Sequence, residues 1–239
     1  MQRFFSRLNF GDAYEFETRV IPAAIIVFPL TILAVSCEIA QGNWLNAIGL
    51  GSGLETFLAI LFSKIAHVLG RKLEDQLKLE WDGLPTTRWL TSGNREHSEQ
   101  QKARWQRFIS ELSGLDLTVG KEPSEEKKII EDAILNVRNK IRNHTKFSLL
   151  KRQNINYGFA RNAAGLRWLG LLTSTISTII SIILMLYGKI LLGAFIVELV
   201  FLIASIAYCI VGKQHVKYTA DRYAESFFTA SEKILPLNN

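Results

Sequence analysis

The sequence predicts an all-α integral membrane protein, with four transmembrane helices arranged as two hairpins and a helical cytoplasmic domain between them. The chain of 239 residues has a mean hydropathy of +0.14, which is high for a soluble domain. The excess comes from runs with few charges: 18 uncharged residues separate Arg19 from Glu38, and 21 separate Arg167 from Lys189. About 20 apolar residues of helix are enough to cross a bilayer.

Two further runs complete the set of four candidate spans. Residues 39–63 carry only Glu55, and the run between Lys189 and Lys213 carries only Glu198. This pattern excludes a soluble enzyme, a disulfide-rich secreted domain and a disordered protein. It divides the chain into a cytoplasmic N-terminal segment (1–19), a first transmembrane hairpin (20–63), a basic helical cytoplasmic domain (64–167), a second transmembrane hairpin (168–212) and a cytoplasmic C-terminal tail (213–239).

The placement of Lys and Arg predicts the orientation of the spans. Basic residues stand before the first and third spans and after the second and fourth, whereas the turns at 41–43 and 187–189 hold only Lys189. Cytoplasmic loops carry the excess of positive charge, so both termini and residues 64–167 are expected in the cytoplasm. Within that domain, apolar residues from Ile129 to Ile141 recur at helical spacing after a start at Pro123.

Two acids interrupt the apolar runs at a similar depth. Glu55 lies 11 residues beyond Trp44, and Glu198 lies 10 residues beyond Gly188, so both are roughly 15 Å from the outer surface. A carboxylate near the midplane is costly unless it meets water or a partner. Two interpretations stay open: the acids line a cation-favouring pore, or each is a protonated clamp between helices.

The third span carries a stripe of hydroxyl side chains. Ser174, Ser177 and Ser181 share one helical face, and such a stripe either lines water or lets helices pack closely. Together with Glu55 and Glu198 they are the candidate pore-lining residues. A conducting path needs more walls than four short helices in lipid provide, so a homo-oligomer is expected, with a tetramer as the working assumption.

A long basic stretch precedes the third span. No Asp or Glu occurs from Ala133 to Val197, while residues 133–167 carry eight Lys and Arg interleaved with Asn. Anionic lipid headgroups are one partner for this charge. The other is a phosphate-bearing ligand, a nucleotide or short oligonucleotide. The candidate ligand-binding residues are Arg138, Arg142, Lys146, Lys151, Arg152, Tyr157 and Arg161.

Catalytic and metal-binding signatures are not found in the sequence. The four histidines lack metal-ligand spacing, and there is no nucleophile elbow, zinc-protease helix or phosphate-binding loop. Cys37 and Cys209 fall in spans near opposite faces of the membrane and are interpreted as small apolar residues. We therefore expect no enzyme activity, no cofactor and no metal.

Two stretches carry a resemblance to a known group of proteins: residues 81–90 (WDGLPTTRWL) and 154–162 (NINYGFARN). With the two-hairpin layout, they resemble bacterial multi-span membrane effectors of anti-phage loci, such as the pore-forming effector of nucleotidyltransferase-paired systems like Hailong. The resemblance implies an oligomeric ion channel of the bacterial inner membrane. It also implies that the cytoplasmic part binds a nucleotide oligomer made by a nucleotidyltransferase-like synthase, and that pore opening depolarises the membrane and causes abortive infection.

A second function belongs to a different class. The chain is then a non-conducting membrane anchor that recruits a soluble defence partner through its basic domain. In an anchor the two acids have only a structural role, so Glu55→Gln and Glu198→Gln leave function intact, whereas charge reversal at Arg138 and Arg142 abolishes partner binding.

Overall fold

The computed structural model describes residues 13–117, 122–142 and 147–234, and all the regular elements within these ranges are helices. The chain begins with α2 (Ala13–Glu15), the π-helical η2 (Phe16–Val20) and α3 (Ile21–Ala40). It continues through α4 (Trp44–Glu80), the short α5 (Pro85–Arg88), α6 (Glu99–Ser113) and α7 (Pro123–Arg142). Two long helices, α8 (Ser148–Leu186) and α9 (Leu192–Ile234), complete it.

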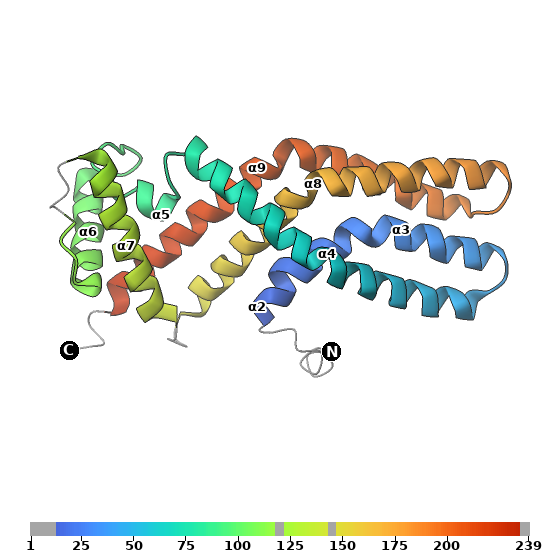
Figure 1. Cartoon of the computed structure of the whole chain (residues 1–239), viewed down its shortest axis with the longest axis horizontal. Helices are drawn as coiled ribbons and strands as arrows, with labels where there is room; N and C mark the ends of the chain where they lie inside the picture. Colours follow the sequence, from blue (N-terminus) through green and yellow to red (C-terminus); the bar gives the residue numbers. More distant parts are fainter. Residues whose placement is uncertain (1–12, 118–121, 143–146, 235–239) are drawn as a thin grey trace. The chain divides into compact units, whose positions relative to one another are not determined.

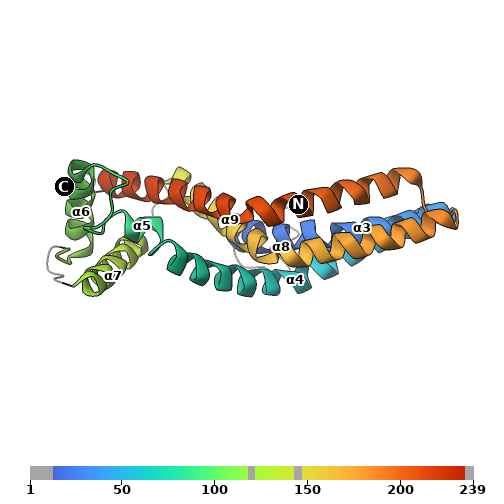
Figure 2. The ribbon, with the colours of Figure 1, turned by 90° about the horizontal axis from the view of Figure 1, so that it is seen from above.

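The predicted fold class is confirmed. Within the described residues, the helices that begin at α2, α4, α8 and α9 are long and apolar enough to cross a membrane. Figures 1 and 2 show them as two hairpins, α3 with α4 and α8 with α9, with α5 to α7 between the pairs in the chain. The protein is therefore a multi-span helical membrane protein.

Both hairpins turn at the predicted places because a glycine lies in the turn that follows the first helix of each hairpin. Gly42 has a φ of +81°, and Gly188 has a φ of +64°. Glycine reaches this left-handed region without steric cost, and the turn lets N–H groups bond the last carbonyls of the helix. Gly42 N–H donates to the carbonyl of Ile39 at 2.9 Å, and Gly188 N–H donates to that of Met185 at 3.0 Å.

Three of the long helices continue well past their apolar stretches. α4, α8 and α9 contain 37, 39 and 43 residues, against the roughly 20 that a bilayer requires. The polar continuations contain many Lys, Arg and Ala residues, which favour helix, and no proline interrupts them. α8, for example, starts 20 residues before Trp168, where the third span was predicted to begin.

The chain divides by its contacts into two compact units. The membrane unit comprises residues 1–74 and 158–216, and the helical unit comprises residues 75–157 and 217–239. Most of the segment predicted as a cytoplasmic domain lies in the helical unit. Its two ends, 64–74 and 158–167, belong to the membrane unit, and the segment predicted as a tail contributes the end of α9 to the helical unit.

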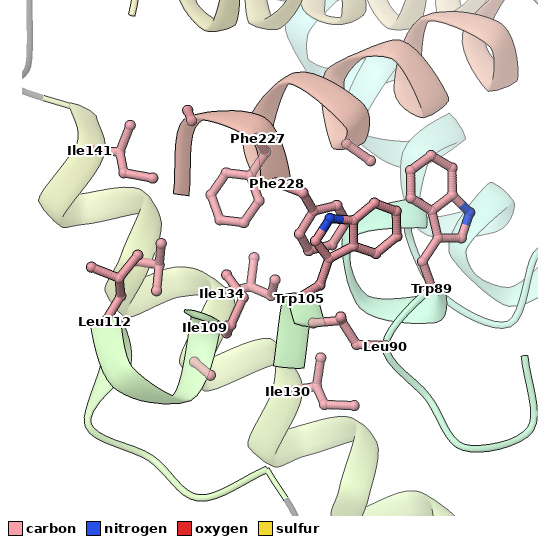
Figure 3. Packing of buried hydrophobic residues seen from close by; sticks show 14 of the residues in the cluster. Trp89, Leu90, Trp105, Ile109, Leu112, Ile130, Ile134, Ile141, Phe227 and Phe228 are labelled. Atoms are coloured by element: carbon pink, nitrogen blue, oxygen red, sulfur yellow. The ribbon is translucent and has the colours of Figure 1, made fainter. Parts of the chain in front are cut away.

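The helical unit has an aromatic and aliphatic core. Trp105 of α6 stacks on Phe228 of α9 with ring centroids 4.4 Å apart, and Trp89 lies 6.0 Å from Trp105. Figure 3 shows these rings beside aliphatic side chains of α6 and α7. The predicted helical spacing is confirmed, because α7 buries one face, made of Ile130, Ala133, Ile134, Val137 and Ile141.

Candidate functional site

A fully buried acid lies in the apolar part of α9. Glu198 has 0% of its surface exposed, and the neighbouring Ser177 hydroxyl interacts with its carboxylate, but no well-formed hydrogen bond reaches either oxygen from the described residues. The hydroxyl of Ser181 on α8 is also buried without a partner within the described part of the chain. Buried polar groups are normally hydrogen-bonded, and a buried carboxylate without well-formed hydrogen bonds costs several kcal/mol, so this placement requires an explanation.

Hydroxyl side chains of α8 surround this acid and complete what we call the Glu198 cluster: Glu198, Ser177, Thr178 and Ser181. Thr178 Oγ1 donates to the backbone carbonyl of Glu198 at 3.5 Å, which places the two residues opposite each other in the hairpin. Ser177 and Ser181 flank Thr178 on α8, and both have 0% exposure. The cluster is thus a group of polar side chains enclosed by apolar helices.

The helix α3 closes the cluster on a further side. Ser177 Oγ donates to the carbonyl of Pro29 at 2.9 Å, and Thr173 Oγ1 donates to the carbonyl of Ile26 at 2.6 Å. Both carbonyls lie inside α3, where a carbonyl oxygen can accept a hydroxyl in addition to the helical N–H four residues on, because it has two lone pairs. The hydroxyl stripe of α8 therefore joins the second hairpin to the first.

The candidate pore-lining residues fall into two groups. Ser174, Ser177, Ser181 and Glu198 are buried between helices of one chain, and Ser174 Oγ shares a hydrogen bond with Ser205 Oγ at 3.0 Å. Glu55 is on α4, is half-exposed and accepts a hydrogen bond from Thr31 of α3. The bond of Thr178 to the Glu198 carbonyl places Glu198 beside Ser177 and Ser181, whereas no hydrogen bond among the described residues joins Glu55 to these side chains.

Glu55 lines a groove between α3 and α4, which we call the Glu55 groove. Thr31 Oγ1 donates to Glu55 Oε2 at 2.5 Å. The groove has a volume of about 500 Å³, and its walls include Phe28, Thr31, Val35, Ile48, Gly51 and Glu55. A smaller hollow of about 290 Å³ shares Phe28, Thr31 and Val35 and reaches Leu191 and Ala194 of the second hairpin.

Of the candidate ligand-binding residues, three are solvent-exposed cations. Arg138 on α7 and Lys151 and Arg152 on α8 are exposed, and all three belong to the helical unit. Arg142 ends α7, but its side chain lies outside the described residues, as does Lys146. The exposed cations are available to an anionic ligand.

Tyr157 and Arg161 are held by other side chains. Tyr157 is buried and stacks on Tyr223 with ring centroids 6.2 Å apart. Arg161 Nη1 lies 2.7 Å from Glu74 Oε2, and their side chains are only 12% and 13% exposed. Within the structure described, these two residues connect helices to each other.

A helix crossing in the membrane unit was missed by the sequence reasoning. Asn162, which is 0% exposed, donates from Nδ2 to the carbonyl of Thr18 at 2.6 Å. Beside it, a Cβ built on Gly165 would lie 2.6 Å from the backbone nitrogen of Gly70. The signal was present, because Gly158, Asn162 and Gly165 follow one another at spacings of four and three on one helical face.

The segment 81–90 forms the turn after α4. Asp82 and Gly83 have φ values of +56° and +115°, and Pro85 begins α5. Arg88 Nη2 and Trp89 Nε1 both donate to Glu96 Oε2, at 2.9 and 2.7 Å. These residues build the core of the helical unit and its adjoining loop.

The described residues hold no group of three or more His, Cys, Asp or Glu side chains placed to bind a metal ion. No family model, curated protein or solved structure matches the chain. Functional inference therefore rests on the Glu198 cluster, the Glu55 groove and the exposed basic residues.

Proposed function

We propose that the protein is a subunit of an oligomeric, ligand-gated cation pore of the bacterial inner membrane, and that it acts as an anti-phage effector by depolarising that membrane. The observation that carries the proposal is the burial of Glu198 without a well-formed hydrogen bond to either oxygen. A carboxylate in the middle of an apolar helix is expensive in every state that keeps it dry. Such a residue has a function in a second state, in which water reaches it.

In the conformation described, the Glu198 cluster is enclosed, so this conformation corresponds to a closed pore. Opening requires α8 to move relative to α9 or α3 and to break hydrogen bonds such as Ser177 Oγ to the Pro29 carbonyl. Each such hydrogen bond stabilises the closed state by about 1 kcal/mol. A ligand of ordinary affinity that prefers the open state can offset this energy. The freed hydroxyls and the carboxylate then line a hydrated path that favours cations.

The ligand in this proposal is a nucleotide or short oligonucleotide. Arg138, Lys151 and Arg152 are exposed and carry positive charge without any acid between Ala133 and Val197. Lys151 and Arg152 lie on α8, the helix that carries the serine stripe, so ligand binding acts directly on a pore helix. The free energy by which the ligand shifts the equilibrium toward the open state equals the difference in its binding free energy between the open and closed states.

Ion flux through the purified full-length protein tests the proposal. The protein is reconstituted in liposomes with a potassium gradient, and the membrane potential is followed by dye fluorescence with and without short anionic oligonucleotides. Glu198→Gln is expected to move the reversal potential toward zero, because removing the carboxylate lowers the preference for cations. Glu38→Gln, at the end of α3, is the matched control and is expected to behave as wild type. The absence of flux under every condition, or wild-type selectivity in Glu198→Gln, would contradict the proposal.

A specific observation favours a second function, the non-conducting membrane anchor. The hydroxyls of Ser174 and Ser177 are used in hydrogen bonds between helices, as in tight packing. An anchor keeps its function when Glu198 is replaced by Gln and loses it when Arg138 and Arg152 are reversed to Glu. Only Glu198→Gln separates the two functions, because reversal of Arg138 and Arg152 removes ligand binding from a pore as well as partner binding from an anchor, and the measurement that separates them is ion flux in liposomes.

A further inference from the structure

The Glu55 groove combines features that the pore proposal does not use. Its walls are almost wholly apolar, yet a carboxylate opens into it, and Thr31 Oγ1 supplies one hydrogen bond to that carboxylate. A carboxylate offers about four acceptor positions, so one hydroxyl leaves most of its capacity unused. At the depth of Glu55 in the apolar segment, acceptor positions without a donor cost free energy unless a cation or a water molecule binds to them.

The dimensions of the groove fit a compact organic molecule. Its volume of about 500 Å³ lies in the range of small-molecule sites. Thr31 and Glu55 lie toward one end, and Ile39 and Trp44 lie toward the hairpin turn; the 11 residues from Trp44 to Glu55 span roughly 16 Å. Gly51 contributes to this shape, because a Cβ there would lie 2.6 Å from Val35 Cγ2.

The Glu55 carboxylate on the groove wall limits which molecules can occupy the groove. A lipid acyl chain fills apolar space but leaves the carboxylate facing hydrocarbon. A helix from a second copy of the chain brings no cation to the depth of Glu55 either, because Lys189, the one Lys or Arg within residues 20–63 and 168–212, lies at a hairpin turn roughly 15 Å away along the helix axis. A molecule with an apolar body and one positive charge would both contact the apolar walls and pair with the carboxylate.

We propose that the Glu55 groove binds a hydrophobic monocation, with the Glu55 carboxylate as its counter-ion and the ring of Phe28 in contact with its apolar body. Phe28 lines the groove at the Glu55 end and is 40% exposed, so its ring is accessible to a ligand. Aromatic rings attract cations and apolar groups alike. This site is independent of conduction, because it is a property of the first hairpin in the closed conformation.

Binding of radiolabelled tetraphenylphosphonium to the purified full-length protein in detergent tests the site. We expect saturable binding with one site per chain, and no competition from uncharged tetraphenylmethane. Glu55→Gln is expected to weaken binding at least about tenfold, because removal of the counter-ion leaves the cation unpaired in an apolar groove. Glu38→Gln makes the same charge change in the same hairpin but outside the groove wall, and is expected to bind as wild type.

A second variant keeps the test decisive if Glu55→Gln fails to fold. Ser52→Phe fills the groove from an exposed position and keeps the carboxylate, so it is expected to abolish binding in a protein that still elutes as a single species. The proposal is overturned if tetraphenylphosphonium only partitions without saturation, or if a folded Glu55→Gln or Ser52→Phe variant binds it as wild type does. The first of these results means that lipid alone occupies the groove.

Discussion

Gly165→Ala tests the helix crossing of the membrane unit most directly. The added Cβ would lie 2.6 Å from the backbone nitrogen of Gly70, 2.7 Å from the carbonyl carbon of Leu69 and 2.8 Å from the Cα of Gly70. All three are backbone atoms, so no side-chain rotation relieves the contact. Carbon atoms pack at about 3.5–4.0 Å, and α4 and α8 must therefore move apart by about 1 Å.

The cost follows from what this separation disrupts. Overpacking of this kind costs about 1–3 kcal/mol, and the ion pair of Arg161 with Glu74, at 2.7 Å between the same two helices, weakens by about 1 kcal/mol more. Replacing glycine inside a helix returns about 1 kcal/mol. The net loss is about 2 kcal/mol, which corresponds to a decrease of roughly 4–8 °C in melting temperature for a chain of this size.

Thermal unfolding in detergent, followed by circular dichroism at 222 nm, measures this change. Gly193→Ala is the matched control, because no described atom lies within 4 Å of the Cβ position at Gly193 and its φ is not left-handed. We expect Gly193→Ala to melt within about 2 °C of wild type. If Gly165→Ala melts as high as this control, the close crossing of α4 and α8 is wrong.

Three further experiments test the helical unit and the ion pair. Trp105→Ala removes a ring stacked in the core and is expected to cost about 3–5 kcal/mol, seen as a loss of near-ultraviolet circular dichroism. Lys102→Met removes a buried ammonium that donates to two loop carbonyls; faster proteolytic cleavage within residues 91–98 is expected, and an unchanged rate would contradict this role. A double-mutant cycle with Arg161→Met and Glu74→Gln is expected to give a coupling of about 1 kcal/mol or more in unfolding measurements, and additive effects would refute the pairing.

The sequence predicted the membrane-spanning helices well because their signal is local. An apolar run of the right length forms a helix in lipid whatever its neighbours are, since no other structure satisfies the backbone. The glycines at 42 and 188 likewise mark their turns by conformation alone. These features depend on composition and spacing along the chain, which a single sequence displays in full.

The direction in which each helix faces could not be predicted in the same way. Glu198 and the serine stripe were both visible in the sequence, but whether they face water or a neighbouring helix depends on the position of α3, which is far away in the sequence. Arg161 similarly pairs with Glu74, 87 positions away. The basic pattern around Arg161 indicated ligand binding, whereas only the tertiary structure reveals its acidic partner.

The segment 213–239 illustrates a missed signal of another kind. Val216, Ala220, Ala224, Phe227 and Ile234 recur at helical spacing and are buried in the structure. The spacing was visible in the sequence, but a charged start at Lys213 and the end of the apolar run suggested a tail. Three- and four-residue periodicity is more informative here than mean hydropathy.

The hydroxyl contacts between α8 and α3 have a consequence for how the two hairpins respond to hydration. Thr173 and Ser177 donate to carbonyls inside α3, and such bonds between hairpins are strong only where nothing competes for them. A water molecule that entered this seam could replace each hydroxyl at little enthalpic cost. In the proposed pore, wetting of the bundle would therefore be coupled to separation of its two hairpins.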